Sequence, residues 1–483
     1  MSQLGSTLMP PLDGLPNVKS HPSGDRFMAR AMVDRMTFGF TAADGALYEQ
    51  LGFDQYLYTQ LHPSTIDDSA LDAYVAVNYP GLVFTGSQAV NAASQGDLLN
   101  QLQRARLYRA IFSKKQLYER IVECFTDHLN IWIRDDVAGI LKVVDDRDVV
   151  RANAMGTFPN MLRASAHSPS MLAYLNNDTN TKTAPNENYA RELMELHTLS
   201  VTGGYSQSDV QQVAKCFTGW SYSTGTAVDS YTFRYNSSNH DVNQKIVLGN
   251  IIPARAAASG QQDGEDVINI LANHPSTRDF VARKLIRHFL QHDPPPSALV
   301  SSVSQVYQAT GGSIPAMVAE IFYYAIANPV PMKFKRPMHL LVSSLRALGA
   351  QVTATNNLQS PLTEAGHLPF DWNPPDGYPD TLQAWTDLLL ARWNFGARLM
   401  NGTTGDWWNT TSLSGIRVDH TTIVGTATAK NAIVDAINAK LFNGVLSVPE
   451  RNQLLAFLPA TASTTNIREV LGLAVSLPTF QWY

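Results

Sequence analysis

The sequence predicts a mainly α-helical protein, a large orthogonal bundle of many helices with a small β-hairpin element near residues 230–252. Most of the 483 residues fall in runs whose apolar side chains recur every three or four positions, as they do in amphipathic helices. Only one short region carries β-type runs between turn residues. Hydrophobic residues make up 44% of the chain, which is enough to fill sizeable cores.

We expect three regions along the chain. Residues 1–24 are rich in Pro, Gly and Ser and predict an extended N-terminal arm. Residues 25–400 form the main helical domain, with the β-hairpin as an insertion at about 222–255. Residues 401–483 form a C-terminal helical extension packed on that domain.

The helices are expected in the following order. The first ends before Gly39, and Thr41 is the predicted N-cap of the second. Further helical runs cover 98–134, 146–166, 168–176, 187–201, 207–218, 263–273, 276–291, 297–309, 314–327, 335–349 and 381–400, and two or three helices close the chain. The stretch 351–380 is rich in Pro, Gly and Asn and predicts a loop.

The predicted β element consists of two short runs, Ser230–Tyr235 and Lys245–Ile252. Both are rich in β-branched and aromatic residues, which favours strands. The polar stretch Asn236–Asn243 lies between them. The two runs therefore predict a hairpin with a long polar loop.

The composition and charge of the chain argue against a nucleic-acid partner and against a membrane span. Charged residues make up 16% of the chain, against about 25% in an average soluble protein. The net charge of −5 carries no basic run, so no nucleic-acid partner is expected. No apolar stretch is long enough to span a membrane, and the first residues do not resemble a signal peptide. Cys124 and Cys216 are expected to be buried free thiols, with a single disulfide as the alternative.

The segment Asn186–His197 carries most of the candidate chemistry. Glu192 and Glu195 lie about 60° apart on a helix, and Asn188 and Arg191 fall on the same side. Two carboxylates that lie close together acquire different pKa values, so one can donate a proton while the other accepts one. Arg191 would then hold an anionic group. The structural alternative is an ion pair between Arg191 and Glu195, with Glu192 bonded to a neighbouring backbone.

A second candidate pair is His240-Asp241, in the predicted hairpin loop. Adjacent His and Asp residues can supply a general base and the group that orients it, or two metal ligands. The alternative is a turn with a surface histidine. Candidate substrate-binding residues are Asn188, Trp220, Lys245, Trp372 and Tyr378. The last two lie in Pro369–Asp380, which suits either a wall for stacking carbohydrate or a stiff loop packed on the body.

A second helix, Gln116–Arg134, has a polar face. That face carries Glu119, Glu123, Asp127, Asn130 and Arg134. His128 lies on the apolar face, where it is either a core residue or, with His197, part of a common pocket that holds a metal. The chain contains no Gly-x-Ser-x-Gly, phosphate-loop, dinucleotide or His-Glu-x-x-His motif.

Several of these segments resemble the bacterial domain-of-unknown-function family number 1800. The central motif runs through Asn186–Thr198, Gly203–Val210 and Phe217–Trp220. Other matching stretches are Arg35–Gly39, Phe125–Asn130, His240-Asp241 with Lys245 and Leu248-Gly249, Lys335–Pro337, Arg346–Gly349 and Asp376–Asp380. Together they span roughly residues 26–400.

The resemblance implies a cellular location but no particular reaction, because the family is uncharacterised. Its members often carry export signals and often neighbour a sulfatase-like family in genomes, which implies an envelope or extracellular location and a surface-protein partner. The chain departs from the pattern at Thr126, where family members often have a histidine. That departure weakens any metal site built on the helix around His128.

Three functions are consistent with these observations. The leading hypothesis is an exported or envelope-associated hydrolase or lyase acting on a glycan or similar polar polymer. Glu192 and Glu195 would be its acid and base, Arg191 its anion clamp, and His240-Asp241 the loop pair that closes the site. The first alternative is a metal- or haem-dependent oxidoreductase with a divalent metal as a candidate cofactor. The second is a non-catalytic binding or assembly protein with Trp407-Trp408 as a contact patch.

Overall fold

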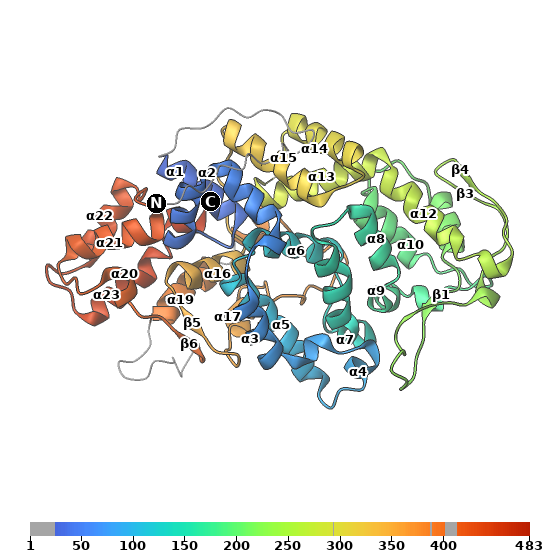
Figure 1. Ribbon diagram of the computed structural model, residues 1–483, viewed down its shortest axis with the longest axis horizontal. Helices are drawn as coiled ribbons and strands as arrows, with labels where there is room; N and C mark the ends of the chain where they lie inside the picture. Colours follow the sequence, from blue (N-terminus) through green and yellow to red (C-terminus); the bar gives the residue numbers. More distant parts are fainter. Residues whose placement is uncertain (1–24, 293, 387–388, 401–412) are drawn as a thin grey trace, which may run out of the picture.

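The computed structural model describes residues 25–292, 294–386, 389–400 and 413–483. Helices dominate these residues, and strands occur in them only as three two-stranded antiparallel sheets. The predicted mainly α fold class is therefore confirmed. Figure 1 shows an elongated body with the C-terminal helices at one end and the strands β3 and β4 at the other. The predicted arm 1–24 and the Trp407-Trp408 loop lie outside the described residues.

The described helices and strands have the following bounds. In the first half of the chain the helices are α1 (Arg26–Met36), α2 (Ala42–Leu61), α3 (Ser69–Asn78), α4 (Gly86–Val90), α5 (Gln95–Phe112), α6 (Gln116–His128), α7 (Asp136–Asp145), α8 (Phe158–Ala166), α9 (Pro169–Tyr174), α10 (Asn188–Glu192) and α11 (Gln207–Cys216). Two π-helical turns, η3 (Asp146–Arg151) and η5 (Leu193–Thr198), continue α7 and α10.

In the second half the helices are α12 (Gln262–Asn273), α13 (Pro275–Phe289), α14 (Ser297–Thr310), α15 (Ile314–Ala327), α16 (Pro337–Ala347), α17 (Gln359–Glu364), α18 (Leu382–Thr386), α19 (Leu389–Met400), α20 (Thr421–Val424), α21 (Lys430–Phe442), α22 (Val448–Phe457), α23 (Thr464–Ala474) and α24 (Pro478–Gln481). The strands are β1 (Trp220–Tyr222), β2 (Phe233–Tyr235), β3 (Lys245–Val247), β4 (Asn250–Ile252), β5 (Gln351–Val352) and β6 (Ile416–Arg417).

Local capping explains several helix boundaries. The Thr41 hydroxyl accepts a hydrogen bond from the Asp44 N–H, which confirms Thr41 as the N-cap of α2. The long run predicted for 98–134 is divided between α5 and α6. At the break, Asp68 accepts hydrogen bonds from the Ser113 hydroxyl and the Lys114 N–H, and these contacts hold the turn in place. None of the described helices is long and apolar enough to cross a membrane.

The β element is confirmed in place, but its expected pairing is wrong. β2 pairs with β1, and β3 pairs with β4. Leu248 and Gly249 both have positive φ, at 50° and 77°, so they form a tight two-residue turn that folds the second run back on itself. The stretch 236–243 is therefore not the loop of one hairpin. It connects two small sheets.

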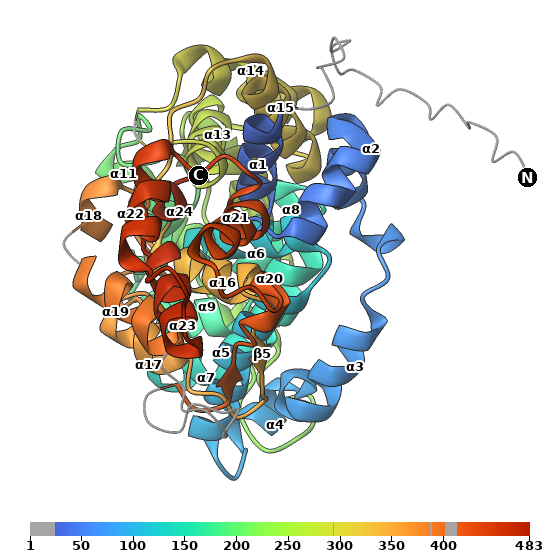
Figure 2. The same cartoon turned by 90° about the vertical axis from the view of Figure 1, so that its left-hand side faces the viewer.

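Two large hydrophobic clusters form most of the core. The larger joins α1, α2 and α6 to the helices from α8 to α15. The other joins the C-terminal helices to α16, to the end of α5 and to Phe38. Figure 2 shows these C-terminal helices lying across the end of the body that faces the viewer. Phe334 also forms a β-bridge with Trp482. The division of the chain at residue 400 stays a prediction. Cys124 and Cys216 are buried free thiols, as expected.

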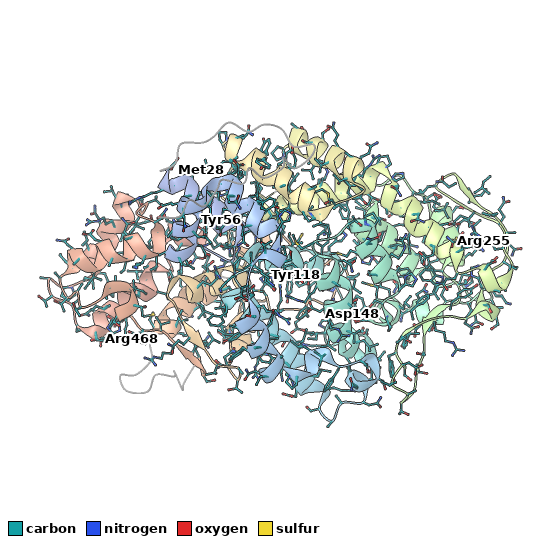
Figure 3. The ribbon with its side chains drawn as sticks, in the orientation of Figure 1. Met28, Tyr56, Tyr118, Asp148, Arg255 and Arg468 are labelled. Atoms are coloured by element: carbon teal, nitrogen blue, oxygen red, sulfur yellow. The ribbon has the colours of Figure 1, made fainter. Side chains whose placement is uncertain are left out.

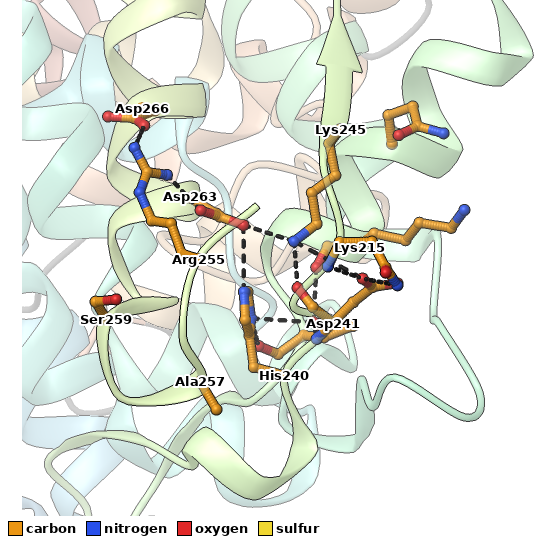
Figure 4. A network of polar contacts seen from close by, with 12 residues as sticks. Lys215, His240, Asp241, Lys245, Arg255, Ala257, Ser259, Asp263 and Asp266 are labelled. Atoms are coloured by element: carbon orange, nitrogen blue, oxygen red, sulfur yellow. Dashed lines mark hydrogen bonds and ion pairs between the residues drawn. The ribbon is translucent and has the colours of Figure 1, made fainter. Parts of the chain in front are cut away.

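A buried ionic network holds the small sheets against α12 (Figure 4). The Asp263 carboxylate is fully buried and lies 3.2 Å from His240 Nε2 and 2.6 Å from Lys245 Nζ, and it also pairs with Arg255. His240 Nδ1 lies 2.9 Å from the carbonyl oxygen of Thr218. One carboxylate thus ties together segments before β1, between the sheets and on α12.

We predict that Asp263→Asn lowers the free energy of unfolding by about 3–5 kcal/mol, because it removes the carboxylate that lies 2.6 Å from the buried Lys245 ammonium and leaves the more distant Asp241, at 3.9 Å, to balance that charge. Asp266→Asn is the matched control, since Asp266 is partly exposed, pairs with the partly exposed Arg255 and accepts a hydrogen bond from Gln262. It should cost less than about 1 kcal/mol. Chemical denaturation of both variants measures the difference, and equal losses would contradict the role given to Asp263.

Candidate functional site

Three carboxylates on one face of α6 each bind arginines. Glu119 pairs with Arg151 and, at 3.0 Å, with Arg106. Glu123 pairs with Arg120 at 2.6 Å and with Arg336 at 2.7 Å. Arg336 also lies 2.6 Å from Asp127. The polar face predicted for this helix is therefore real, and arginines from distant parts of the chain cover it.

Beyond the end of α6, two further residues of that predicted face hold a loop. Asn130 donates hydrogen bonds to the carbonyl oxygens of Trp372 and Pro374, at 2.9 and 2.8 Å. Arg134 pairs with Asp371 at 2.5 Å. Gly377 then packs so closely on Asp127 that an added Cβ would lie 1.9 Å from the Asp127 carbonyl oxygen. The loop is thus docked on the C-terminal end of α6.

A polar cavity of about 170 Å³ lies between α6, α13 and this loop. Its charged lining consists of Asp127, Lys284, Arg287, Arg336, Asp376 and Asp380. Lys333 pairs with Asp380 at 2.7 Å, so that carboxylate is already neutralised. The cavity therefore gathers ionisable groups that differ in how completely they are paired.

Lys284 is the cation of this cavity without a partner. Its ammonium lies 5.5 Å from the centre of the Phe280 ring and forms no hydrogen bond or ion pair with any residue that the structure describes. Burial lowers its pKa, while the nearby Cys124 and Asp127 oppose that shift. An amine held in this way is easier to deprotonate than an ordinary lysine.

Asp127 differs from the other two acids of its row. Burial raises its pKa to about 6, although Arg336 acts against that shift. For Glu119 and Glu123 burial also favours the protonated form, but two arginines on each outweigh it and hold both pKa values below the usual value. Asp127 is therefore the carboxyl of α6 that changes its charge near neutral pH.

The predicted carboxylate pair lies near this cavity and is not sealed. Glu192 ends α10, and Glu195 lies in the π-helical turn η5, a feature common at functional sites. Both side chains are half-buried. Arg191 pairs with Glu187 at 3.0 Å and lies 3.9 Å from Glu195.

Glu192 links the half-buried stripe formed by Arg191, Glu192 and Glu195 to the cavity through electrostatic interactions. It forms no ion pair with any described residue, and burial followed by the charge of Glu195 raises its pKa. The charge of Asp376 also contributes to that shift, and Asp376 acts on Lys284 as well. Asp376, which lines the cavity, therefore acts electrostatically on both Glu192 and Lys284.

His128 and His197, which one interpretation of the sequence placed in a common pocket, lie next to each other in the structure. His128 Nε2 lies 3.0 Å from the carbonyl oxygen of His197, and the ring centres are 6.3 Å apart. Burial lowers the pKa of both rings, that of His197 to about 3. Among the described residues, His128 Nδ1 and His197 Nε2 find no hydrogen-bond partner. In the described part of the chain, no group of three or more His, Cys, Asp or Glu side chains is arranged to hold a metal ion.

The other predicted residues divide into two groups. Tyr378 lines the cavity, and Trp372 donates a hydrogen bond to Asp376 at 3.0 Å, so both adjoin the site. Asn188 is exposed and donates a hydrogen bond to the Leu175 carbonyl oxygen. Trp220 is fully buried against Phe217 and α12.

His240 and Asp241 do not join the carboxylate pair. They and Lys245 belong to the Asp263 network, and within the described residues no hydrogen bond or ion pair links that network to Glu192 or Glu195. Figure 3 places Arg255 of the network at one end of the body and Tyr118 of α6 near its middle. The expected closing loop is held instead by a carboxylate of α12, a partner that sequence spacing could not identify.

Several charged residues of the cavity were missed as candidates, among them Asp127, Lys284, Arg336 and Asp376. Arg336 and Asp376 lie inside segments that carry the family resemblance, and that position was an available signal. Lys284 gave no comparable signal, because α13 also carries Arg283 and Arg287 in an ordinary amphipathic pattern. The burial that distinguishes Lys284 arises only when the loop at 376–381 covers it.

Comparison with known proteins gives one match. No curated protein and no solved structure matches the chain. A family described as "Protein of unknown function (DUF1800)" matches residues 31–482, a span that includes α6, α10, α13 and the loop that covers the cavity. The chain therefore belongs to the DUF1800 family of proteins of unknown function.

Proposed function

We propose that this protein is an acid–base enzyme, a hydrolase or lyase that cleaves a glycan or another polar polymer, and that the cavity beside α6 is its catalytic centre. The observation that carries the proposal is the ammonium of the half-buried Lys284, which has no ion pair with any described residue and shares a polar cavity with Asp127. A cation that is partly removed from water without a partner is unfavourable to the fold, so function is the better explanation for keeping it.

Asp127 is the base and Lys284 the acid in this proposal. Asp127, with a pKa of about 6, is ionised near neutral pH, and Lys284 must act in its protonated form. In a hydrolase Asp127 takes a proton from the attacking water, and Lys284 gives one to the leaving oxygen. In a lyase Asp127 takes the proton from carbon, and Lys284 again protonates the leaving oxygen. Arg336 orients the Asp127 carboxylate in both cases.

Glu192, Glu195 and Arg191 have a binding role in this scheme. Their half-buried stripe adjoins the cavity through Asp376, and carboxylates of this kind accept hydrogen bonds from sugar hydroxyls. Trp372 and Tyr378 offer aromatic surface on the same loop. The acid and base roles expected for Glu192 and Glu195 are better met by Lys284 and Asp127, which share an enclosed space.

The proposed setting is the cell envelope or the exterior, and it rests on the family resemblance. The metal-dependent alternative has two adjacent histidines, His128 and His197, but no third ligand among the described residues. The assembly alternative depended on Trp407-Trp408, which lie outside those residues. The acid–base proposal is therefore the one with the most geometric support.

We predict that Lys284→Met lowers the cleavage rate by about 100-fold or more, as loss of a general acid does. The substrate is first found with a panel of polar polymers, using new reducing ends for hydrolysis and the ultraviolet absorbance of an unsaturated product for elimination. The free energy of unfolding should stay unchanged or rise, because the variant removes a half-buried charge that has no ion pair with any described residue. The exposed Lys440→Met is the control. Full activity of Lys284→Met would end the proposal.

The rate should also depend on pH in a specific way. We expect kcat/KM to rise as the pH increases through about 6, where Asp127 loses its proton, and to fall at alkaline pH as Lys284 loses its own. Asp127→Asn should remove the acidic limb together with most of the rate. An acidic limb that persists unchanged in Asp127→Asn would show that another group is the base.

A further inference from the structure

A groove of about 740 Å³ lies between α4, the start of α5 and the loop that joins β1 to β2. None of its lining residues also lines the cavity of Asp127 and Lys284. Figure 1 shows α4 at the lower edge of the body, whereas α13, which carries Lys284, lies near the upper edge. The groove is therefore separate from the proposed catalytic centre.

Neutral side chains supply most of the polar surface of this groove. Among the described residues that line it, Asp97 is the only charged one, and none is a cation. The neutral polar lining consists of Ser87, Gln88, Asn91, Ser94, Gln101 and Thr226. Phosphate groups and nucleic acids are bound mainly through cations, so the groove does not suit them. Its surface favours an uncharged ligand that both donates and accepts hydrogen bonds.

Several donors and acceptors of this lining are free to bind a ligand. The Gln88 side-chain amide N–H groups, the Thr226 hydroxyl and the Asn91 side-chain oxygen form no hydrogen bond with any described residue. Asp97 accepts a hydrogen bond from Gln101 through Oδ2, at 2.8 Å, and its Oδ1 has no partner among the described residues. A hydroxyl group donates one hydrogen bond and accepts others, so a ligand rich in hydroxyls can use both kinds of free group.

The walls of the groove are held in place by contacts that do not use these free groups. Arg147 donates hydrogen bonds to the carbonyl oxygens of Leu82 and Phe84, at 3.0 and 2.9 Å. On the other side, a Cβ added to Gly86 would lie 2.7 Å from the Cβ of Tyr231, so the loop between β1 and β2 packs tightly on α4. A groove that is already formed loses little conformational freedom when a ligand binds.

Phe84 adds an aromatic surface to the groove. Its side chain is half-buried, packs on the core cluster that contains Leu98, and lines the groove together with that leucine. An aromatic surface beside a few placed polar groups is typical of sites that bind organic ligands. A sugar ring satisfies both kinds of surface, because it combines an apolar C–H face with a rim of hydroxyls.

The groove is less suited to a peptide. Extended peptides bind by adding a strand to an open sheet edge, and none of the described residues that line the groove lies in a strand. Helical peptides need a continuous apolar groove, whereas polar and apolar side chains are mixed in this lining. A hydroxyl-rich ligand therefore fits the groove better than a peptide does.

We propose that this groove binds an uncharged glycan chain, with a sugar ring stacked on Phe84 and hydroxyls bonded to Asn91 and Asp97. At about 740 Å³ the groove is much larger than the catalytic cavity of about 170 Å³, so it takes several sugar units. The choice of a glycan follows from the groove itself. Binding here therefore persists even if the proposed cleavage at Asp127 and Lys284 does not occur.

Isothermal titration calorimetry with neutral hexasaccharides derived from cellulose, xylan, mannan, starch and chitin tests the proposal. At least one of them should bind to the full chain, and Lys284→Met should bind it equally well. Phe84→Ala should raise the Kd at least about fivefold, because the stacking surface is lost. Asn91→Ala should raise it about threefold, because one neutral hydrogen bond is lost. The exposed Phe457→Ala and Asn431→Ala are the matched controls and should bind as the unaltered protein does.

Circular dichroism checks that each variant is folded. If Phe84→Ala does not fold, the exposed Gln88→Ala and Asn91→Ala provide the same comparison. The proposal is overturned if no hexasaccharide binds. It is also overturned if Lys284→Met abolishes binding while the groove variants bind normally, because the sugar then occupies the catalytic cavity, as the proposed cleavage reaction requires. An uncharged Gly-Ser-Asn repeat peptide that binds, and that Phe84→Ala weakens while no saccharide binds, would assign the groove to a peptide instead.

Discussion

The rest of this structure depends on the row of carboxylates on α6, two of them buried and one half-buried, and on the arginines that neutralise it. Glu119, Glu123 and Asp127 lie on one face of a helix in the main core, where unpaired charges would oppose folding. Arg336 bridges two of them and so attaches the start of α16 to α6. The end of α5, the turn η3 and the loop at 371–377 also attach along this row. The helices around it can pack closely because each charge in the row finds a partner.

The carboxylates of the row are paired unequally, and this difference separates the two that stabilise the fold from the one that can exchange a proton. Glu119 and Glu123 each have two arginines, which hold their pKa values low and make them permanent anions. Asp127 shares one arginine with Glu123, and its pKa is raised to about 6. Lys284 faces this under-neutralised end without a counter-charge of its own. The same row thus combines two permanently ionised carboxylates with one, at its C-terminal end, that can exchange a proton.

Local features of the fold could be predicted from the sequence, and long-range partners could not. Periodicity placed most helices, Thr41 marked a helix start, and residue spacing placed Glu119, Glu123 and Asp127 on one face. The partner of the last two, Arg336, lies more than 200 residues away, and no local pattern connects them. The π-helical turn at Leu193–Thr198 and the turn at Leu248-Gly249 were hidden for a different reason, because propensities do not distinguish such turns from regular elements. His240 was expected in a catalytic loop, but a buried aspartate on α12 holds it, and Lys284 became a candidate only through its burial.

The central claim is that Asp127 alone among the carboxylates of α6 is left free to exchange a proton near neutral pH. Infrared difference spectra of the protonated carboxyl stretch, recorded just below and just above pH 6, test it directly when the unaltered protein is compared with Asp127→Asn. The account predicts a carboxyl band that disappears across this interval in the unaltered protein and is missing from the variant. Identical difference spectra for the two proteins would contradict it, because Asp127 would then be as fully ionised as Glu119 and Glu123.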